Sequence, residues 1–238
     1  MGSEYCTAKS GSHFIMDRNI FYSHTINKIH EREDKRMTNK VIFSGMLLDN
    51  PVFSHKDAGK KFYRARIAYS RINSDKKDII PVAFKEDFIR SAGMKIGAYV
   101  KVIGKYCSRI FETKNKGTIR RNYILANDVI PWFIDTNEAE IVGIVEKDPV
   151  LRKLPNGKSV CEITLVNKLE FSTYYLPTVF WKKNVKPALE LKAGDVISVE
   201  GMLQSRMVRK TSESGGYLSA TSDLSVFSFK KLESDTDV

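Results

Sequence analysis

The chain has few cysteines and no long apolar run. Its 238 residues include three cysteines, Cys6, Cys107 and Cys161, which are odd in number and far apart. They form neither a disulfide framework nor the CxxC pairs that bind zinc. No apolar run approaches the roughly 18 residues needed to cross a bilayer, and the N-terminus lacks the order of a secretion signal. We therefore expect a cytoplasmic protein that does not enter a membrane.

Motifs for catalysis and for metal binding are also missing. The four histidines, His13, His24, His30 and His55, have no metal-ligand spacing. Neither half of the chain carries a Walker loop, a GxSxG elbow or a carboxylate pair that recurs in the other half. We therefore expect no catalytic residues, no metal and no cofactor, in a protein that is not an enzyme.

The chain does contain a duplication. Landmark residues recur 98 positions apart, as Asn39 and Asn137 do. A period of nearly a hundred residues is longer than the roughly 20–50 residues of a solenoid repeat and suits two tandem domains. The remaining pairs are Gly45 and Gly143, Pro51 and Pro149, Gly59 and Gly157, and Lys60 and Lys158.

Each repeat contains five short runs rich in β-branched and aromatic residues, which predict strands. Turn signals around Gly59 and Gly157 predict that each repeat starts with a hairpin. Residues 85–95 and 182–192 are better helix formers, and each lies between the third and fourth runs. This order predicts an all-β fold with one short helix per repeat, namely two tandem five-stranded OB-fold barrels. The runs are residues 41–48, 62–69, 79–84, 99–106 and 123–130, and then 139–146, 159–167, 174–180, 196–203 and 217–227.

The repeats also predict domain boundaries. We expect an N-terminal extension, flexible or helical, at residues 1–36, and a first OB-fold domain at residues 37–132. A second OB-fold domain would follow at residues 133–230, with a short acidic tail at residues 231–238. We expect Trp132 and Phe133, at the junction, to pack the two barrels together.

The excess of positive charge belongs to the first repeat. The chain has 39 Lys and Arg residues against 28 Asp and Glu, a net charge of +11. Residues 37–132 hold 19 of these cations against 8 anions, whereas residues 133–229 hold 12 against 12. A polyanion-binding surface has this character, because each neutralised phosphate releases condensed counterions. A solvated basic surface that aids solubility is the alternative, and charge alone favours neither.

The second repeat carries a longer pattern of landmark residues, namely Gly143, Asp148-Pro149, Leu151-Arg152, Pro155-Asn156-Gly157-Lys158, Leu191-Lys192-Ala193-Gly194, Glu200-Gly201, Leu203-Gln204 and Arg206. In this order, the pattern strongly resembles the bacterial single-stranded DNA-binding protein (SSB) family. The first repeat is more divergent, and its clearest counterparts are residues 39–45, 49–51 and 97–104.

The resemblance implies sequence-independent binding and protection of single-stranded DNA in replication, recombination or repair. Aromatic rings would stack on bases and cations would follow the phosphates. It implies a nucleoid-associated protein that pairs as a homodimer to give four barrels and meets replication or recombination proteins, and it leaves RNA open as a ligand. The usual acidic tip ending in Pro-Phe is missing from the end of this sequence.

Aromatic candidates for base stacking come from the same resemblance. A phenylalanine in an alternating strand is more often buried in the core than exposed for base stacking, so a purely structural role for each ring stays open. Phe171 and Phe111 are the stronger candidates because both lie among polar neighbours, whereas Asn73 and Asp78 occupy two family stacking positions in the first repeat. The candidate rings are Tyr69, Phe84, Phe111, Phe171, Tyr174, Phe180 and Trp181.

Cationic candidates follow from strand alternation and from the basic first repeat. Arg64 and Arg66 alternate with apolar residues, so both should project from the outward face of the second strand. The candidate phosphate contacts are Arg64, Arg66, Arg71, Lys85, Lys101, Lys105, Arg109, Lys158, Lys168 and Arg206. The alternative hypothesis is an SSB-like interaction or assembly module, of primosomal or mobile-element type, that binds nucleic acid weakly.

Overall fold

The computed structural model describes residues 37–72, 74–113, 117–212 and 215–233, without the side chains of residues 111–119 and 208–219. Residues 37–238 form one compact unit. The predictions made for residues 1–36, for Asn73 and for the end of the acidic tail lie outside the described residues. The predicted boundary between two separate domains at residues 132 and 133 stays a prediction.

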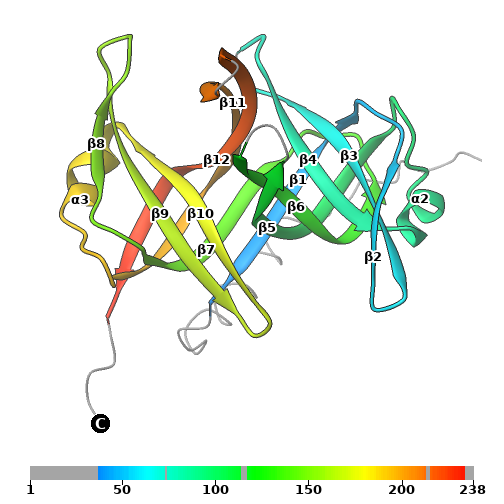
Figure 1. Ribbon diagram of the computed structural model, residues 1–238, viewed down its shortest axis with the longest axis horizontal. Coiled ribbons are helices and arrows are strands. Elements are labelled where there is room, and N and C mark those ends of the chain that lie inside the picture. Colours follow the sequence, from blue (N-terminus) through cyan, green and yellow to red (C-terminus); the bar gives the residue numbers. More distant parts are fainter. Residues whose placement is uncertain (1–36, 73, 114–116, 213–214, 234–238) are drawn as a thin grey trace, which may run out of the picture. The chain divides into compact units, whose positions relative to one another are not determined.

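The first half of this unit is a closed five-stranded barrel with one additional edge strand (Figure 1). β1 pairs with both β3 and β5, β3 pairs with β4, and β5 pairs with β6. The parallel pair β4–β6 closes the barrel, and β2 extends it by pairing with β3. The elements are β1 (Asn39–Leu47), β2 (Val52–Asp57), β3 (Lys60–Ser70), β4 (Lys77–Lys85), α2 (Asp87–Ser91), β5 (Tyr99–Thr113) and β6 (Gly117–Pro131).

The second half repeats this topology element by element. β7 pairs with β9 and β11, the parallel pair β10–β12 closes the barrel, and β8 is the additional edge strand. The prediction of an all-β chain with two OB-fold barrels is therefore confirmed. The elements are β7 (Asn137–Val145), β8 (Val150–Lys153), β9 (Ser159–Leu169), β10 (Ser172–Trp181), η1 (Lys182–Asn184), α3 (Val185–Leu189), β11 (Val196–Ser212) and β12 (Gly215–Leu232).

The two barrels share one sheet because their first strands pair with each other. β1 runs antiparallel to β7, from Asn39 opposite Ile141 to Phe43 opposite Asn137. The six strands β6-β5-β1-β7-β11-β12 are therefore consecutive in one hydrogen-bonded sheet. Since β1 and β7 are equivalent strands of the duplication, this antiparallel pairing relates the barrels by an approximate two-fold axis.

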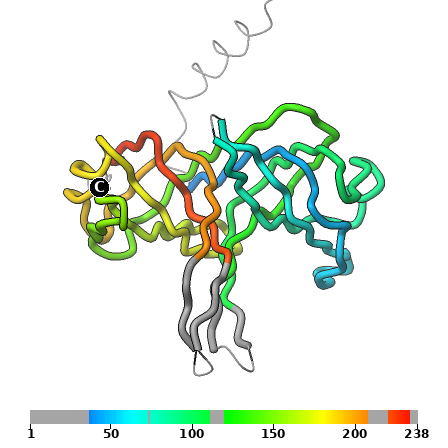
Figure 2. Tube along the Cα trace, turned by 90° about the horizontal axis from the view of Figure 1, so that it is seen from above, coloured from blue at the N-terminus to red at the C-terminus, as the bar shows by residue number. Residues whose placement is uncertain are grey.

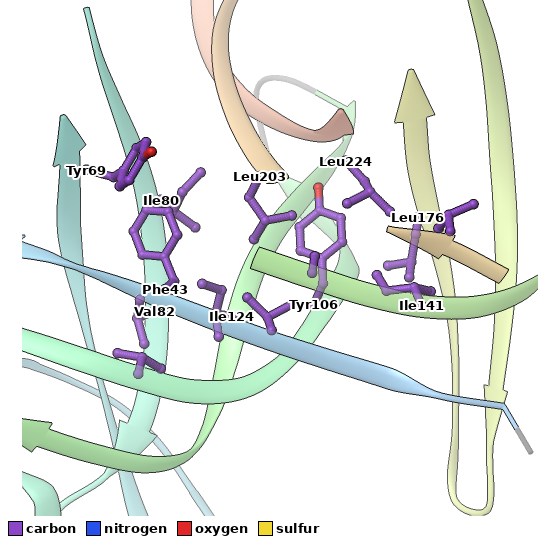
Figure 3. Close-up of a cluster of buried hydrophobic side chains, with 14 of the residues drawn as sticks. Phe43, Tyr69, Ile80, Val82, Tyr106, Ile124, Ile141, Leu176, Leu203 and Leu224 are labelled. Carbon is purple, nitrogen blue, oxygen red and sulfur yellow. The ribbon is translucent and has the colours of Figure 1, made fainter. Parts of the chain in front are cut away.

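The apolar core is continuous between the barrels. Figure 3 shows Phe43 and Ile80 from the first barrel and Leu176 and Leu224 from the second, all fully buried. Tyr106 lies between these groups, with its ring buried and its hydroxyl donating to the carbonyl oxygen of Ser222 at 2.7 Å. Burial of these side chains is the main stabilising contribution, because apolar area removed from water contributes about 25 cal/mol per Å².

The strands extend beyond the predicted runs. β5–β6 and β11–β12 continue as long hairpins, and the side chain of Asn122 in β6 donates to the carbonyl oxygen of Ser222 in β12 at 2.7 Å. In Figure 2 the coloured parts of these hairpins leave the barrels side by side. Sequence patterns missed most of this extension, because its few apolar residues, such as the exposed Ile110 and Met207, form no periodic apolar face.

Two strands were not predicted, and both helices are shorter than predicted. β2 and β8 are mainly exposed, so neither carries the alternating apolar signal of a half-buried strand. Each is held by backbone pairing with a longer neighbour, β3 or β9. α2 and α3 have five residues each, and α3 contains Pro187, which lacks the N–H that a longer helix would use.

Candidate nucleic-acid interface

The outward side of β3 carries two exposed arginines. Arg64 and Arg66 are exposed, whereas the alternating residues Ala65 and Ile67 are buried, as the alternation predicted. Arg64 lies between Val52 of β2 and residue 83 of β4 in the ladder. The cation is therefore central on the outward side of this three-stranded part of the barrel.

A stacked pair of aromatic rings lies on the same side of the sheet as Arg64, two residues earlier along β3. Phe62 is opposite His55 in β2 and Lys85 in β4. The rings of Phe62 and His55 stack with centroids 5.0 Å apart and planes 9° apart. Sequence reasoning missed both rings, although the two-residue spacing between Phe62 and Arg64 was a usable signal. We call Phe62, His55, Arg64 and Lys85 the β2–β4 face.

The equivalent face of the second barrel has different chemistry. Glu162 lies 98 positions after Arg64 and accepts a hydrogen bond from Arg152 Nη1 at 3.0 Å. Arg206 Nη1 lies 3.9 Å from the same carboxylate, and Arg206 Nε also contacts Asp223. Trp181 is half-buried beside Val160 in the ladder. The two arginines of this face, Arg152 and Arg206, are therefore already paired with carboxylates.

An open groove runs over this part of the second barrel, and no aromatic residue lines it. Four carboxylates border it together with the cations Lys147 and Arg206. An anionic strand would be repelled by such a lining, so we do not place the phosphate path in this groove. The carboxylates are Glu146, Asp148, Glu162 and Asp223.

Burial governs the acidity of the groove carboxylate Asp223. Desolvation raises the pKa of Asp223 above its ordinary value, and this effect outweighs the lowering by Arg206. The sequence analysis named Arg206 as a candidate phosphate contact. The structure places the Arg206 guanidinium in contact with the largely buried carboxylate of Asp223, so this cation is already engaged within the protein.

Phe171 is the most exposed aromatic candidate in the described residues. It lies in the turn between β9 and β10, with 89% of its surface exposed, and Lys168 nearby is also exposed. Tyr174 is half-buried and packs against the core. A ring that is solvated on both faces can receive a base without any rearrangement of the barrel.

Three predicted stacking rings are buried. Phe84 and Phe180 have no exposed surface, and Tyr69 is 5% exposed. The Phe180 ring makes an edge-to-face contact with the Phe229 ring. The Tyr69 ring packs against the Phe43 ring, with their centroids 6.0 Å apart. These rings occupy inward positions of their strands, where burial of a large apolar side chain is most favourable. Their predicted role as exposed stacking platforms is therefore wrong.

Two predicted phosphate contacts of the first barrel are paired with carboxylates. Arg66 donates to both oxygens of Asp49 at 2.7 and 2.8 Å, and this hydrogen bonding holds the pKa of Asp49 below its ordinary value. Arg71 donates to both oxygens of buried Asp78 at 2.7 and 2.6 Å. Asp78 also accepts from the backbone N–H of Ser205, in the second barrel, at 2.7 Å. Arg71 thus supports the contact between the barrels.

The remaining cationic candidates are dispersed over the first barrel and the hairpins. Lys105 is half-buried on β5, Arg109 is exposed farther along the same strand, and Lys158 is exposed in the β8–β9 turn. Lys101 stacks its ammonium group over Trp132, 3.1 Å from the ring centroid. The side chain of Phe111 lies outside the described residues.

Additional exposed rings and one arginine were missed by sequence reasoning. Tyr175 of β10 is 38% exposed, and the Arg120 guanidinium of β6 lies 5.9 Å from its ring centroid. Phe133 is 80% exposed, so the prediction that it packs between the barrels is wrong. Its ring stacks on Trp132 with centroids 5.6 Å apart. The Tyr174-Tyr175 pair was the available sequence signal, since neighbouring strand residues point to opposite sides.

The buried cysteines carry no sign of reactivity. Cys107 and Cys161 are free and buried, and desolvation raises the pKa of each thiol to about 11. Among the described residues, no group of three or more His, Cys, Asp or Glu side chains could hold a metal ion. In the same part of the chain, no helix is long and apolar enough to span a bilayer.

The fold and these faces can be compared with known proteins. Residues 136–221 match the model of the single-strand binding protein family. The second barrel has the pattern of this family. The resemblance predicted from residues 143–206 is thereby confirmed, and the match begins one residue before β7. No curated protein matches the chain.

Two solved structures of this type have the same overall arrangement. The wild-type single-stranded DNA-binding protein from Thermus aquaticus is 19% identical, with a TM-score of 0.65, covering 85% of this chain and 97% of the other. A deletion mutant of the Thermus protein is 20% identical, with a TM-score of 0.64, covering 86% and 98%. At this identity the likeness concerns the fold, and it extends over both barrels rather than the second alone.

Proposed function

We propose that this protein binds single-stranded DNA without sequence preference and protects it, without covalent chemistry. The family match of the second barrel is the observation that carries the proposal. Two OB-fold barrels, an exposed ring at Phe171 and exposed cations at Arg64 and Lys168 support it. Stacking suits sequence-tolerant binding because every base has a π-face, and each stacked base contributes about 1–3 kcal/mol.

We further propose that the two barrels contribute unequally. At equivalent positions the first barrel has Arg64 where the second has Glu162, and Glu162 is already paired with Arg152. The β2–β4 face would therefore supply phosphate contacts and the stacked rings of Phe62 and His55. The second barrel would contribute chiefly the exposed ring of Phe171.

The primary experiment is a titration of the full chain with oligothymidylate, followed by tryptophan fluorescence at about 50 and about 300 mM salt. We expect quenching, saturable binding and a steep loss of affinity with salt, because phosphate neutralisation releases counterions. A duplex of the same length should bind more weakly, and an oligouridylate measures the preference for DNA over RNA. Absence of oligothymidylate binding at the lower salt concentration would refute the proposed function.

A matched pair of double variants tests the unequal contribution. Arg64→Ala with Lys85→Ala should weaken binding and reduce the slope of log affinity against log salt by about 1.4, because each phosphate that is no longer neutralised reduces the slope by about 0.7. Lys158→Ala with Lys168→Ala removes the same charge from the second barrel and should change the slope less. Equal effects from both pairs would contradict the unequal model while leaving DNA binding intact.

The alternative is an assembly module that binds nucleic acid weakly. Burial of three predicted stacking rings and the carboxylate pairing of Arg66, Arg71 and Arg206 favour this alternative. In either case we propose a cytoplasmic, nucleoid-associated protein that acts as a homodimer with four barrels. Replication or recombination proteins are its proposed further partners.

A further inference from the structure

The outward side of the β9–β10 ladder changes in charge from one end to the other. At one end Glu162 is opposite Val179, and both line the groove that carboxylates border. At the other end the exposed Lys168 is opposite Thr173, and Tyr175 follows two residues later on the same side. Glu162 and Lys168 are six positions apart in β9, or about 20 Å at 3.3 Å per residue. An anionic strand is therefore attracted at one end of this ladder and repelled at the other.

The end with Lys168 meets a cation of the other barrel. β10 passes beside β5 of the first barrel, and residues 37–238 form one compact unit. There the Arg120 guanidinium of β6 lies 5.9 Å from the centroid of the Tyr175 ring, within the roughly 6 Å of a cation–π contact. Each barrel supplies one member of this pair, so the pair lies at a junction between the barrels.

The Tyr175–Arg120 pair has the chemistry of a nucleotide site. Tyr175 is 38% exposed and Arg120 is exposed as well, so a ligand can reach both side chains. An exposed ring surface can stack on any base. A guanidinium that lies over a ring uses its own face for that contact, and its N–H groups, which lie in the guanidinium plane, can still donate to phosphate oxygens. The pair can therefore hold a base and a neighbouring phosphate together.

The duplication creates a second junction, which lacks the ring. Ile79 in β4 precedes Pro81 by two residues, as Tyr175 in β10 precedes Pro177. The backbone N–H of Ile79 donates to the hydroxyl oxygen of Ser205 in β11 at 3.0 Å. Ile79 thus lies beside a strand of the other barrel, as Tyr175 does, but its side chain cannot stack on a base.

The second junction also lacks the cation. Arg120 is opposite Ile110 in the β5–β6 hairpin, and the corresponding residue of the β11–β12 hairpin is Ala220, opposite Met207. An isoleucine and an alanine therefore stand at the positions that tyrosine and arginine occupy at the other junction. Of these two residue pairs, only Tyr175 and Arg120 combine a ring with a cation.

We propose that a single strand of DNA crosses from the second barrel to the first over Tyr175 and Arg120, and that each chain has one such crossing. The strand contacts Phe171 and Lys168 at the β9–β10 turn and then stacks a base on Tyr175. It leaves the second barrel there, because the carboxylate of Glu162 lies ahead. Arg120 holds the next phosphate and directs the strand onto the β5–β6 hairpin. We call Phe171, Lys168, Tyr175 and Arg120 the crossing site.

The crossing rests on the proposed binding of single-stranded DNA and specifies the path of that strand. It makes the two barrels one continuous site for one strand rather than two sites for separate strands. A failure of DNA binding appears in the wild-type chain, whereas a failure of the crossing appears only in the comparison of variants. The two failures are therefore distinguishable.

The first experiment is a fluorescence titration of the full chain with an oligothymidylate of about 35 nucleotides, which can cover two OB folds of about 4–16 nucleotides each. Tyr175→Ala should weaken binding roughly 5- to 150-fold, because one stacked base is lost. Tyr175→Phe keeps the ring and should stay within about twofold of wild type. Arg120→Ala should reduce the slope of log affinity against log salt by about 0.7, the contribution of one phosphate.

Matched controls separate the crossing from general effects. Ile79→Ala truncates the equivalent residue, which is 37% exposed, and Arg90→Ala removes the same charge from an exposed position in α2. Both should bind within about twofold of wild type, since neither position belongs to the crossing site. Thermal melting is measured on every variant, because a purely structural Tyr175–Arg120 contact would lower the melting temperature and leave the salt slope unchanged.

The second experiment tests whether one strand continues across the junction. Titration of polythymidylate with the full chain measures how many nucleotides each chain occludes. Tyr175→Ala with Arg120→Ala should reduce this number, because the barrels then no longer share one strand, whereas Ile79→Ala with Arg90→Ala should not. An oligothymidylate that contains 5-iododeoxyuridine, irradiated with the wild-type chain, should crosslink to Tyr175, and mass spectrometry locates the crosslinked residue.

Several results would overturn the crossing while leaving DNA binding intact. They are a loss for Tyr175→Phe as large as that for Tyr175→Ala, an unchanged salt slope for Arg120→Ala, equal occluded lengths for the two double variants, and the absence of crosslinks at Tyr175. If the wild-type chain does not bind oligothymidylate at about 50 mM salt, the proposed function and the crossing fail together.

Discussion

Asn39 and Asn137, which are 98 positions apart, make the same two hydrogen bonds in the two barrels. Asn39 Nδ2 donates to the carbonyl oxygen of Tyr106, and its Oδ1 accepts from the Tyr106 N–H, both at 2.8 Å. Asn137 binds Leu203 in the same way at 2.8 and 2.9 Å. Each side-chain amide thus pairs the backbone N–H and C=O of a buried residue, Tyr106 in β5 or Leu203 in β11. These hydrogen bonds lie beside the β1–β7 pair.

The first prediction concerns these amides. Asn137→Ala leaves the N–H and C=O of Leu203 without partners, and should reduce the free energy of unfolding by about 1–3 kcal/mol. Asn39→Ala should reduce it more, because Asn39 also donates to Asn167 Oδ1 at 3.0 Å. Urea denaturation of both variants measures the difference. Asn50→Ala, at an exposed position with one backbone contact, is the control, and equal losses at all three sites would contradict the interpretation.

The second prediction separates stacking from packing among the phenylalanines. Phe171→Ala should weaken oligothymidylate binding by about 1–3 kcal/mol, or roughly 5- to 150-fold, without changing the melting temperature, because the ring is 89% exposed. Phe180→Ala should instead reduce the free energy of unfolding by about 3–5 kcal/mol, because the ring is fully buried. Fluorescence titration and thermal melting are measured on both. A stability loss at Phe171 as large as that at Phe180 would refute the assignment of Phe171 to the surface.

The third prediction is that two aspartates change stability with pH in opposite directions. The pKa of Asp49 is lowered from 3.8, chiefly by its hydrogen bond to Arg66, so its contribution is present above pH 3.8 and lost as pH falls through the folded-state pKa. The pKa of Asp223 is raised from 3.8, chiefly by burial, so its contribution is present below pH 3.8 and lost as pH rises through the folded-state pKa.

Unfolding free energies between about pH 3 and 7 check this difference in sign. As pH rises, wild type should gain stability relative to Asp49→Asn and lose stability relative to Asp223→Asn. Glu190→Gln, at an exposed position after α3, controls for the general effect of acid. Parallel curves for the two aspartate variants would contradict the opposite pKa shifts.

The fourth prediction concerns equivalent glycines in the two first strands. A Cβ at Gly45 would lie 2.1 Å from the backbone oxygen of Ala68, so the β1–β3 contact must open. At Gly143 the nearest atom is Leu165 Cβ at 3.1 Å, and that contact can relax by a smaller shift. Gly45→Ala should cost about 1–3 kcal/mol or more, and Gly143→Ala less than about 1 kcal/mol. Chemical denaturation measures both, and a larger loss at Gly143 would contradict the difference in packing.

Much of the architecture could be predicted because the duplication repeats a local pattern. Runs rich in β-branched and aromatic residues at 41–48 and 139–146 predicted the first strands within two residues of β1 and β7. Alternation in the second run predicted Arg64 and Arg66 on one outward side. β2 and β8 could not be predicted this way, since their stability comes from pairing with β3 and β9 rather than from an apolar face.

The candidate site was less predictable than the fold. Phe84 and Phe180 match stacking positions in sequence, yet both lie inside their barrels, because a strand pattern alone does not indicate which side is covered. Arg71 was predicted as a surface phosphate contact, but the structure places Asp78 and Ser205 beside it. Ser205 is 134 residues away from Arg71 in the chain, so no local pattern could indicate this contact. Phe62 and His55 became candidates only because backbone pairing brought their rings together.

The amino-acid order alone determined that there are two β-barrels, that they are equivalent, and that the first carries the positive charge. Those properties depend on local alternation and on composition, which are present in every segment of the chain. The tertiary structure decided which rings and cations are available to a ligand, and how the charged residues of two barrels share one sheet. These depend on contacts between residues far apart in the chain, where burial and ion pairing are determined by strand register and barrel closure.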